Sequence, residues 1–368
     1  TVCAMVSIPQ NIQELNSYKP GKPIADLIKE LNLDQWAILW NNENNLGPSP
    51  IALEHIAQAL ATSNVYPDPS SVALRELIAH ANDCHPNQVM VNNGSETILD
   101  GMFRAFFETD EELLTCEGTF VAVYVWAKSN KIKVNKAPLS KNYRFDIQHL
   151  VENITPKTKA IYIANPNNPT GTIITKSELD ELLEAVPENI LVVIDEAYFE
   201  YAKALSPDYP DSTTLERPNV LTLRTFSKAY GIAAIRIGYA IGPEYLIDAL
   251  NKVRMTFAPS NAAQAAGIGA IKDTAHLRKS IELNTRALPQ FYAALHDSEL
   301  NYIPSFGNFV MVDMQSIEQA KEFTEKLMRK GVFVRHLPAF GLPHCVRIST
   351  GTEVENELFV KTLALLHD

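Results

Sequence analysis

The chain has 368 residues, 46% of them hydrophobic and 20% charged, which is the balance of a globular protein. This length is too great for one ordinary core and predicts two domains. The 43 acidic residues outnumber the 32 basic ones, the net charge is −11, and no basic run is evident, so a nucleic-acid partner is not expected.

The first 45 residues are rich in Asn, Pro and Gly, as in YKPGKP and NNENNLGPSP. They predict an extended N-terminal arm around a short helix at about 23–32, and we expect this arm to belong to the smaller domain. Two helices with apolar residues at helical spacing should follow, at 51–63 and 70–82.

A strand–helix alternation then begins and defines the expected large domain, residues 46–250. Because apolar runs such as ILVVI are nearly continuous, we expect a sheet that is covered on both faces and mostly parallel. The predicted fold class is therefore α/β with a seven-stranded sheet. The strands are expected at 88–92, 112–116, 132–137, 159–164, 189–194, 220–225 and 236–241, and helices at about 95–107, 120–129, 145–152 and 176–186.

The remaining residues, 251–368, predict a smaller α+β domain. Residues 244–289 are mostly helical in pattern and should contain the hinge between the domains. The elements expected after them are strand 308–313, helix 317–330, strands 332–335 and 345–349, and a final helix 353–366.

Polar segments follow several of the predicted strands at their carboxyl ends. NNGSET follows QVMV, NPNNPTG follows KAIYIA, DEAY follows NILVVI, and TFSK follows VLTL. Open α/β sheets bind ligands in the crevice outside these ends, so the sequence predicts one site there.

These segments, in this order, resemble the histidinol-phosphate aminotransferase family, which consists of fold-type-I enzymes that use pyridoxal 5'-phosphate (PLP). The similar pieces run from about residue 18 to 356 and are YKPG, NENNLGPSP, YPD, NNGSE, NPNNPTG, DEAYFEY, TFSKAYGIAAIRIGY, NFVMVD and VFVRHLPAFGLPHCVRISTGT. Two positions depart from the family, since Gly118 and His336 stand where proline is usual.

The resemblance implies that Lys228 carries PLP as a Schiff base and moves the proton during catalysis. Asp195 would pair with the pyridine nitrogen and keep it protonated, because a buried carboxylate needs a partner. Tyr198 and Asn168 would hydrogen-bond the ring hydroxyl, and Phe120 would stack on the ring. Core packing for Phe120, and a structural ion pair or helix cap for Asp195, are the alternatives.

The cofactor phosphate needs hydrogen-bond donors and positive charge. The start of the helix after NNGSE can supply backbone amides, and a guanidinium can bind a phosphate through two hydrogen bonds. Tyr66 matches a family tyrosine that reaches the phosphate from a second subunit, which implies a homodimer with shared sites. The expected phosphate ligands are Gly94, Ser95, Glu96 (through its amide), Thr225, Ser227, Arg236 and Tyr66.

The substrate residues implied by the resemblance are Tyr18, Asn42, Arg335 and Arg347. Arg347 would bind a carboxylate or a phosphate, and Arg335 with Tyr18 would contact a substrate phosphate. The expected reaction is L-histidinol phosphate with 2-oxoglutarate, giving imidazole acetol phosphate and glutamate. Aromatic amino-acid aminotransferase and threonine-phosphate decarboxylase are alternatives with the same fold, and a non-catalytic binding protein is a further one.

The cysteines and the start of the chain bear on location and metals. Cys3, Cys84, Cys116 and Cys345 match no metal-binding or redox spacing, so we expect free thiols, no metal and a reducing compartment. TVCAMVSIPQ lacks the pattern of a secretory signal, and no apolar stretch reaches the roughly 18 residues of a membrane span. We therefore expect a cytoplasmic protein without a membrane partner.

Overall fold

The computed structural model describes residues 6–17 and 22–366 and contains a seven-stranded sheet. Its strand order is β2-β8-β7-β6-β5-β3-β4, and all neighbours are parallel except β8, which is antiparallel to β2 and β7. The predicted mostly parallel α/β sheet is therefore confirmed. The strands are β2 (Val89–Asn92), β3 (Glu112–Cys116), β4 (Lys133–Ala137), β5 (Thr158–Ala164), β6 (Leu191–Asp195), β7 (Val220–Thr225) and β8 (Gly238–Ile241).

Helices cover both faces of this sheet, which explains its continuous apolar strands. Val193 packs with helices on one face, whereas its neighbours Val192 and Ile194 pack on the other. The first face carries α5 (Ser95–Phe106), α6 (Val121–Ser129) and α10 (Glu244–Val253). The second carries α7 (Ile147–Glu152) and α8 (Lys176–Ala185), and, beside β2 and β8, α4 (Val72–Ala81) and α11 (Asn261–Lys272). Helix α3 (Pro50–Leu60) packs on α11.

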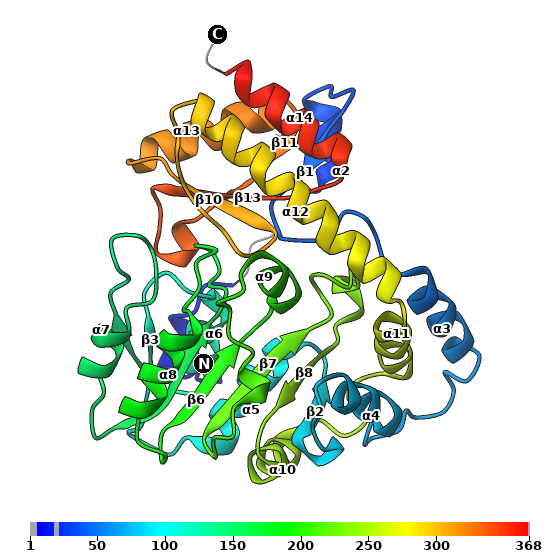
Figure 1. Cartoon of the computed structure of the whole chain (residues 1–368), viewed down its shortest axis with the longest axis vertical. Coiled ribbons are helices and arrows are strands. Elements are labelled where there is room, and N and C mark those ends of the chain that lie inside the picture. The colour runs from blue at the N-terminus through cyan, green and yellow to red at the C-terminus, as the bar shows by residue number, and fades with distance from the viewer. Residues whose placement is uncertain (1–5, 18–21, 367–368) are drawn as a thin grey trace, which may run out of the picture.

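A second sheet has four antiparallel strands in the order β12-β13-β10-β9. Figure 1 shows α2 and β1 from the N-terminal region beside α14 and β11 from the C-terminal region, and β1 pairs in parallel with β11. The elements are α1 (Gln10–Gln13), α2 (Ile24–Glu30), β1 (Ala37–Ile38), α12 (Thr274–Asp297), β9 (Asn301–Ile303), β10 (Phe309–Asp313), α13 (Ile317–Arg329), β11 (Val332–Phe333), β12 (Arg335–His336), β13 (Cys345–Ser349) and α14 (Glu353–Ala364).

Some elements differ from the sequence expectation. The strand expected at 332–335 is two short strands, because β11 pairs with β1 while β12 pairs with β13. The helical stretch after residue 244 divides into α10, α11 and α12. The short helix α9 (Phe199–Leu205) was not predicted, and neither were α1, β1 and β9. Four 3₁₀ turns, η1 (Pro86–Gln88), η2 (Ser212–Thr214), η3 (Ala233–Ile235) and η4 (Pro338–Phe340), complete the order.

The domain division at 45/46 and 250/251 remains a prediction. Helix α11, which lies beyond residue 250, shares a core with α4 and the edge strands of the large sheet. The long helix α12 runs from that region up to the smaller sheet (Figure 1). A boundary inside α12 therefore describes the packing better. No helix among the described residues is long and apolar enough to cross a membrane.

Candidate active site

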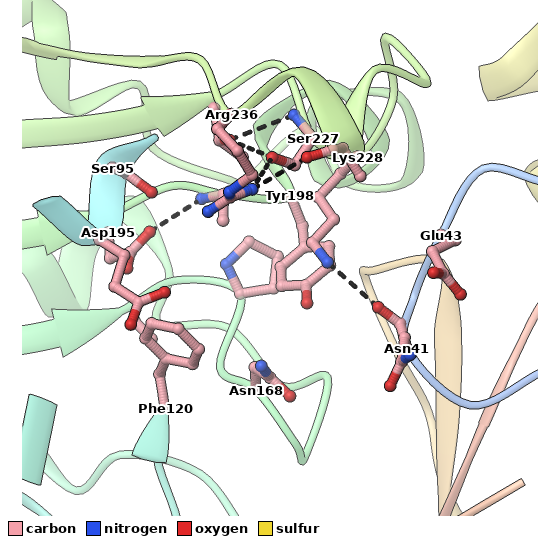
Figure 2. A pocket seen from close by; sticks show the side chains of 16 residues that line it. Asn41, Glu43, Ser95, Phe120, Asn168, Asp195, Tyr198, Ser227, Lys228 and Arg236 are labelled. Carbon is pink, nitrogen blue, oxygen red and sulfur yellow. Dashed lines mark hydrogen bonds between the residues drawn. The ribbon is translucent and has the colours of Figure 1, made fainter. Parts of the chain in front are cut away.

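A pocket lies where β5, β6 and β7 end and where α5 and α6 begin. Residues of β5, β6, β7 and α5 line it, together with Phe120, which precedes α6, and Asn41 and Glu43 from the N-terminal segment (Figure 2). It brings together ten of the residues predicted to bind the cofactor: Ser95, Glu96, Phe120, Asn168, Asp195, Tyr198, Thr225, Ser227, Lys228 and Arg236.

Lys228 is the amine of the pocket. Its Nζ lies 3.2 Å from the backbone oxygen of Asn41. Burial, reinforced by the positive charges of Arg347 and Arg236, lowers the pKa of Lys228 to about 8. A substantial fraction of this amine is therefore neutral near pH 8, which is the form that attacks an aldehyde.

Asp195 is a buried carboxylate at the end of β6, with an exposed fraction of 5%. Burial raises its pKa to about 6, although two hydrogen bonds oppose this effect. The hydroxyl of Tyr162 donates to Oδ2 at 2.7 Å, and the backbone N–H of Ala197 donates to Oδ1 at 3.2 Å. Such a carboxylate favours a cationic partner inside the pocket.

One end of the pocket is suited to an anion. Gly94 precedes α5 with a φ of +84°, and a Cβ there would lie 2.9 Å from Nη2 of Arg236, so the backbone and the guanidinium approach closely. Nη1 of Arg236 donates to the Ser227 hydroxyl at 3.3 Å, and the Thr225 hydroxyl donates to the same oxygen at 3.0 Å. The positive end of the helix dipole, two hydroxyls and a guanidinium match a phosphate.

The carboxylate of Glu96 is engaged elsewhere. It accepts a hydrogen bond from Nε1 of Trp126 at 3.1 Å. This geometry leaves the backbone amide of Glu96 as its means of contacting an anion, as the sequence predicts.

Tyr198 and Asn168 are the residues predicted to bind the ring hydroxyl of PLP. Each accepts a hydrogen bond from a residue that was predicted to bind the substrate. Nδ2 of the buried Asn42 donates to the Tyr198 hydroxyl at 2.8 Å. Nη1 of Arg347 donates to Oδ1 of Asn168 at 2.5 Å, and Nη2 donates to the backbone oxygen of Trp40 at 2.7 Å. Two residues of the pocket wall are therefore held by side chains that come from distant parts of the sequence.

Arg347 is almost fully buried, with an exposed fraction of 4%. Burial lowers its pKa to about 10, so it remains a cation at neutral pH. Its Nε has no hydrogen-bond partner within residues 6–17 and 22–366. Arg335 lies opposite Arg347 in the register of β12 and β13.

Several predicted site residues are not among those that line the pocket: Gly94, Asn42, Arg335, Arg347 and Tyr66. Tyr66 is 77% exposed and stacks on Phe257, with ring centroids 4.3 Å apart, and it does not line the pocket of its own chain. Tyr18 falls in residues 18–21, which are not described.

Two departures from the family pattern have local structural effects. Gly118 has a φ of +60°, whereas proline is fixed near −65°, so the loop before Phe120 adopts a backbone that the usual proline excludes. His336 holds the following turn, because its Nε2 lies 2.6 Å from the backbone oxygen of Pro343.

The sequence reasoning missed two polar residues that line the pocket and a third residue that contacts Asp195 without lining it. Asn41 and Glu43 line the pocket and flank Asn42 in the NNEN segment, which was the available signal. Tyr162 looked like an ordinary core residue of a strand, although it is a polar side chain in the otherwise apolar run AIYIA.

The pocket suits a flat, phosphorylated pyridine aldehyde. Figure 2 shows Lys228 reaching toward Asn41, with Asp195 and Phe120 across the pocket. An amine for an aldehyde, a carboxylate for a ring nitrogen, an aromatic face and an anion site are the groups that PLP requires. The fold and the pocket are those of a fold-type-I PLP enzyme.

Comparison with known proteins identifies the family. The family described as aminotransferase class I and II matches residues 35–363. A histidinol-phosphate aminotransferase of Anaeromyxobacter sp. (strain Fw109-5) is 39% identical over 96% of this chain and 97% of its own length. One of Caldicellulosiruptor saccharolyticus is 38% identical over 96% of this chain and 98% of its own. The chain belongs to the aminotransferase class I and II family and groups there with the histidinol-phosphate aminotransferases.

Solved structures agree with this assignment. The histidinol-phosphate aminotransferase of Sinorhizobium meliloti, determined in complex with PLP, superimposes with a TM-score of 0.88 at 28% identity and covers 100% of both chains. The aspartate aminotransferase of Thermus thermophilus with maleate superimposes with a TM-score of 0.84 at 24% identity, covering 98% of this chain and 99% of its own, and shows the shared fold alone.

Proposed function

We propose that the chain is a PLP-dependent histidinol-phosphate aminotransferase. It transfers the amino group of L-histidinol phosphate to 2-oxoglutarate, giving imidazole acetol phosphate and glutamate in histidine biosynthesis. The names of its relatives support this substrate pair. The observation in the structure that carries it is the pair of facing arginines, Arg335 and Arg347, of which Arg347 hydrogen-bonds Asn168 of the pocket wall.

Lys228 is the residue proposed to hold PLP covalently and to move the proton. When bound, PLP supplies an electron sink for the carbanion formed at the substrate Cα. Nζ of Lys228 would take the proton from the substrate Cα and hold it for return, acting as the general acid and base. Its lowered pKa of about 8 suits this work near neutral pH.

The other pocket residues orient the ring. Asp195, with its carboxylate at the end of β6, pairs with the protonated ring nitrogen. Tyr198 and Asn168 hydrogen-bond the ring hydroxyl, and Phe120 packs on the ring face. These roles agree with the positions of all four residues on the pocket wall.

The proposed phosphate site is the start of α5 together with the loop after β7. The amides at the helix start and the Arg236 guanidinium supply positive potential, and the hydroxyls supply further donors. The proposed ligands are Gly94, Ser95, Glu96, Thr225, Ser227 and Arg236.

The substrate phosphate is assigned to the arginine pair. Arg335 and Arg347 face each other across two antiparallel strands, and the positive charge of Arg335 lowers the pKa of Arg347. Like charges directly opposite in a sheet are destabilising, so the pair favours an anion between them. A phosphate ester, with nearly two negative charges, suits it better than an apolar side chain does. Asn42 belongs to the segment that closes over the substrate, and Tyr18 is proposed for the same end of the pocket.

Replacing Arg335 with leucine should remove the preference for a phosphorylated donor. We expect kcat/KM for histidinol phosphate to fall by about ten- to a hundredfold, because a hydrogen-bonded charge pair is lost. The value for phenylalanine should change little. The measurement is kcat/KM for both donors with 2-oxoglutarate, in the wild type and in Arg335→Leu.

Arg329→Leu is the control, since this exposed arginine at the end of α13 should affect neither donor. A wild type that prefers phenylalanine would indicate an aromatic aminotransferase instead. Equal loss of both activities in Arg335→Leu would also contradict the substrate assignment and leave the aminotransferase assignment intact. A product lacking a carboxyl carbon would indicate a decarboxylase.

We also propose a homodimer with shared active sites. Tyr66 and Phe257 form an exposed aromatic stack, and Val65 and Met255 beside them in sequence are 62% and 75% exposed. Apolar surface of this kind marks protein interfaces. Tyr66, which is exposed and does not line the pocket of its own chain, would reach the cofactor phosphate of the partner subunit.

Mixing Tyr66→Phe subunits with Lys228→Ala subunits tests the sharing. If Tyr66 crosses the interface, each heterodimer has one intact site and one site with both defects. We expect half of the wild-type activity per heterodimer, with wild-type PLP affinity at the active site. The measurement is PLP affinity and turnover of purified heterodimers, and heterodimers without an intact site would show that Tyr66 serves its own chain.

The proposed location is the cytoplasm. The described cysteines, Cys84, Cys116 and Cys345, are free thiols, as expected in a reducing compartment. The relatives are named for a biosynthetic reaction, which agrees with this location.

A further inference from the structure

Tyr162 is a buried tyrosine of the large sheet whose hydroxyl contacts Asp195, a residue of the pocket wall. It lies in the middle of β5, its side chain is fully buried, and it belongs to the apolar core beneath α5 and α6. A buried hydroxyl needs a partner, and this one donates to Oδ2 of Asp195 at 2.7 Å. A phenylalanine would fill the same space without that bond.

We propose that Tyr162 is a positioning residue for Asp195, holding its carboxylate ionised and oriented toward the place of the cofactor's ring nitrogen. This proposal rests on the PLP-dependent function proposed above. Tyr162 does not line the pocket, so it acts only through Asp195.

The orientation follows from how the two carboxylate oxygens are held. Oδ1 accepts the N–H of Ala197, and Oδ2 accepts the hydroxyl of Tyr162. The two donors come from different elements, the turn after β6 and the neighbouring strand β5, and together they fix the plane of the carboxylate. Each oxygen accepts more than one hydrogen bond, so either can still accept the N–H of a pyridinium ring.

The charge of Asp195 depends on the same bond. The groups that face it are Tyr162 from β5, Glu196 beside it in sequence, and Lys228 from the loop after β7, with Tyr198 and Tyr124 near Tyr162. Burial and the negative charge of Glu196 raise the pKa of Asp195, while the hydroxyl of Tyr162 is the strongest influence that lowers it. Without that donor, the carboxylate takes up a proton at higher pH.

The test is PLP binding to the apoprotein as a function of pH, in the wild type and in Tyr162→Phe. PLP binds more tightly when Asp195 is ionised, because the carboxylate then pairs with the protonated ring nitrogen, and the pKa of Asp195 is about 6. If the substitution raises this pKa by about one unit, the ionised fraction falls about fivefold at pH 6 and less than about twofold at pH 8. The ratio of the two dissociation constants, measured by equilibrium dialysis, should therefore grow as the pH falls. The acid limb of the kcat/KM profile should move to higher pH in the same direction.

Tyr209→Phe is the matched control. Tyr209 is equally buried and donates to the backbone oxygen of Asn165 at 2.6 Å, so its removal also deletes one buried hydrogen bond. We expect it to lower thermal stability without a pH-dependent change in PLP affinity.

A second variant should shift the pKa of Asp195 in the opposite direction. Fluorotyrosine at position 162 has a more acidic hydroxyl and is a stronger donor, so the fall in PLP affinity should begin at lower pH than in the wild type. A uniform loss of affinity at every pH, or no change in either variant, would overturn the role of Tyr162. Failure of the wild-type apoprotein to bind PLP would instead contradict the proposed function itself.

Discussion

Replacing Lys228 with alanine should abolish transamination while the chain remains folded. Lys228 is an amine that lines the same pocket as the anion site and Asp195, and its pKa of about 8 makes it both a nucleophile and a proton carrier near neutral pH. Loss of the proton carrier alone removes about a hundred- to ten-thousandfold in rate, and loss of the covalent link adds to this. The measurement is single-turnover transamination at saturating donor.

Two further measurements separate this role from a structural one. Borohydride reduction of the wild-type holoenzyme should fix PLP on the peptide that contains Lys228, and the alanine variant should give no such peptide. A small primary amine added to Lys228→Ala should restore part of the rate, because it can occupy the space of the missing Nζ. Lys203→Ala, at an exposed position of α9, should behave as the wild type. Turnover near the wild-type level in Lys228→Ala would remove this lysine from the mechanism.

The sequence predicts the large sheet well because its strands are short, apolar and separated by helices with clear periodicity. A strand such as β6 is buried on both faces, so its run of apolar residues is enough to predict it from the local sequence. Elements that depend on distant partners were not predictable in this way. The two-residue strand β1 exists because β11 lies beside it, almost 300 positions later in the chain.

The same distinction applies to the site. Residues in motifs at strand ends, such as Lys228 and Asp195, could be placed in one pocket because parallel strands end at the same edge of the sheet. The hydrogen bond from Arg347 to Asn168 joins residues 179 positions apart, and no local pattern encodes it. Tyr162 was missed for a related reason, since strand alternation predicts only that its side chain faces the core.

Replacing Asp195 with asparagine should leave PLP bound but slow proton abstraction by at least about a hundredfold, equivalent to about 3 kcal/mol of transition-state stabilisation. Asparagine keeps the shape of the side chain, but a neutral amide cannot hold the ring nitrogen in its protonated form. The cofactor would then withdraw electrons less strongly from the substrate Cα. The measurement is the rate of Cα–H exchange at full cofactor occupancy, and an unchanged rate there would mean that the ring nitrogen has another partner.

The same substitution should stabilise the apoprotein, which distinguishes a functional carboxylate from a structural one. Burial raises the pKa of Asp195 from 3.8 to about 6, so its ionisation opposes folding. This cost is absent below pH 4, grows as the pH rises from 4 to 6, and reaches about 3 kcal/mol above pH 6. The free energy of unfolding of Asp195→Asn should therefore exceed that of the wild type at pH 8 by up to about this amount, with no gain at pH 4.

Glu196→Gln is the contrasting control, because Glu196 is fully buried and its Oε2 accepts a hydrogen bond from Nε of Arg224 at 2.9 Å. Breaking that buried pair should destabilise the fold by about 3–5 kcal/mol and leave the turnover of the folded fraction close to the wild type. If Asp195→Asn instead lowers apoprotein stability at pH 8 as Glu196→Gln does, Asp195 holds the fold together and its burial has no special connection to the cofactor.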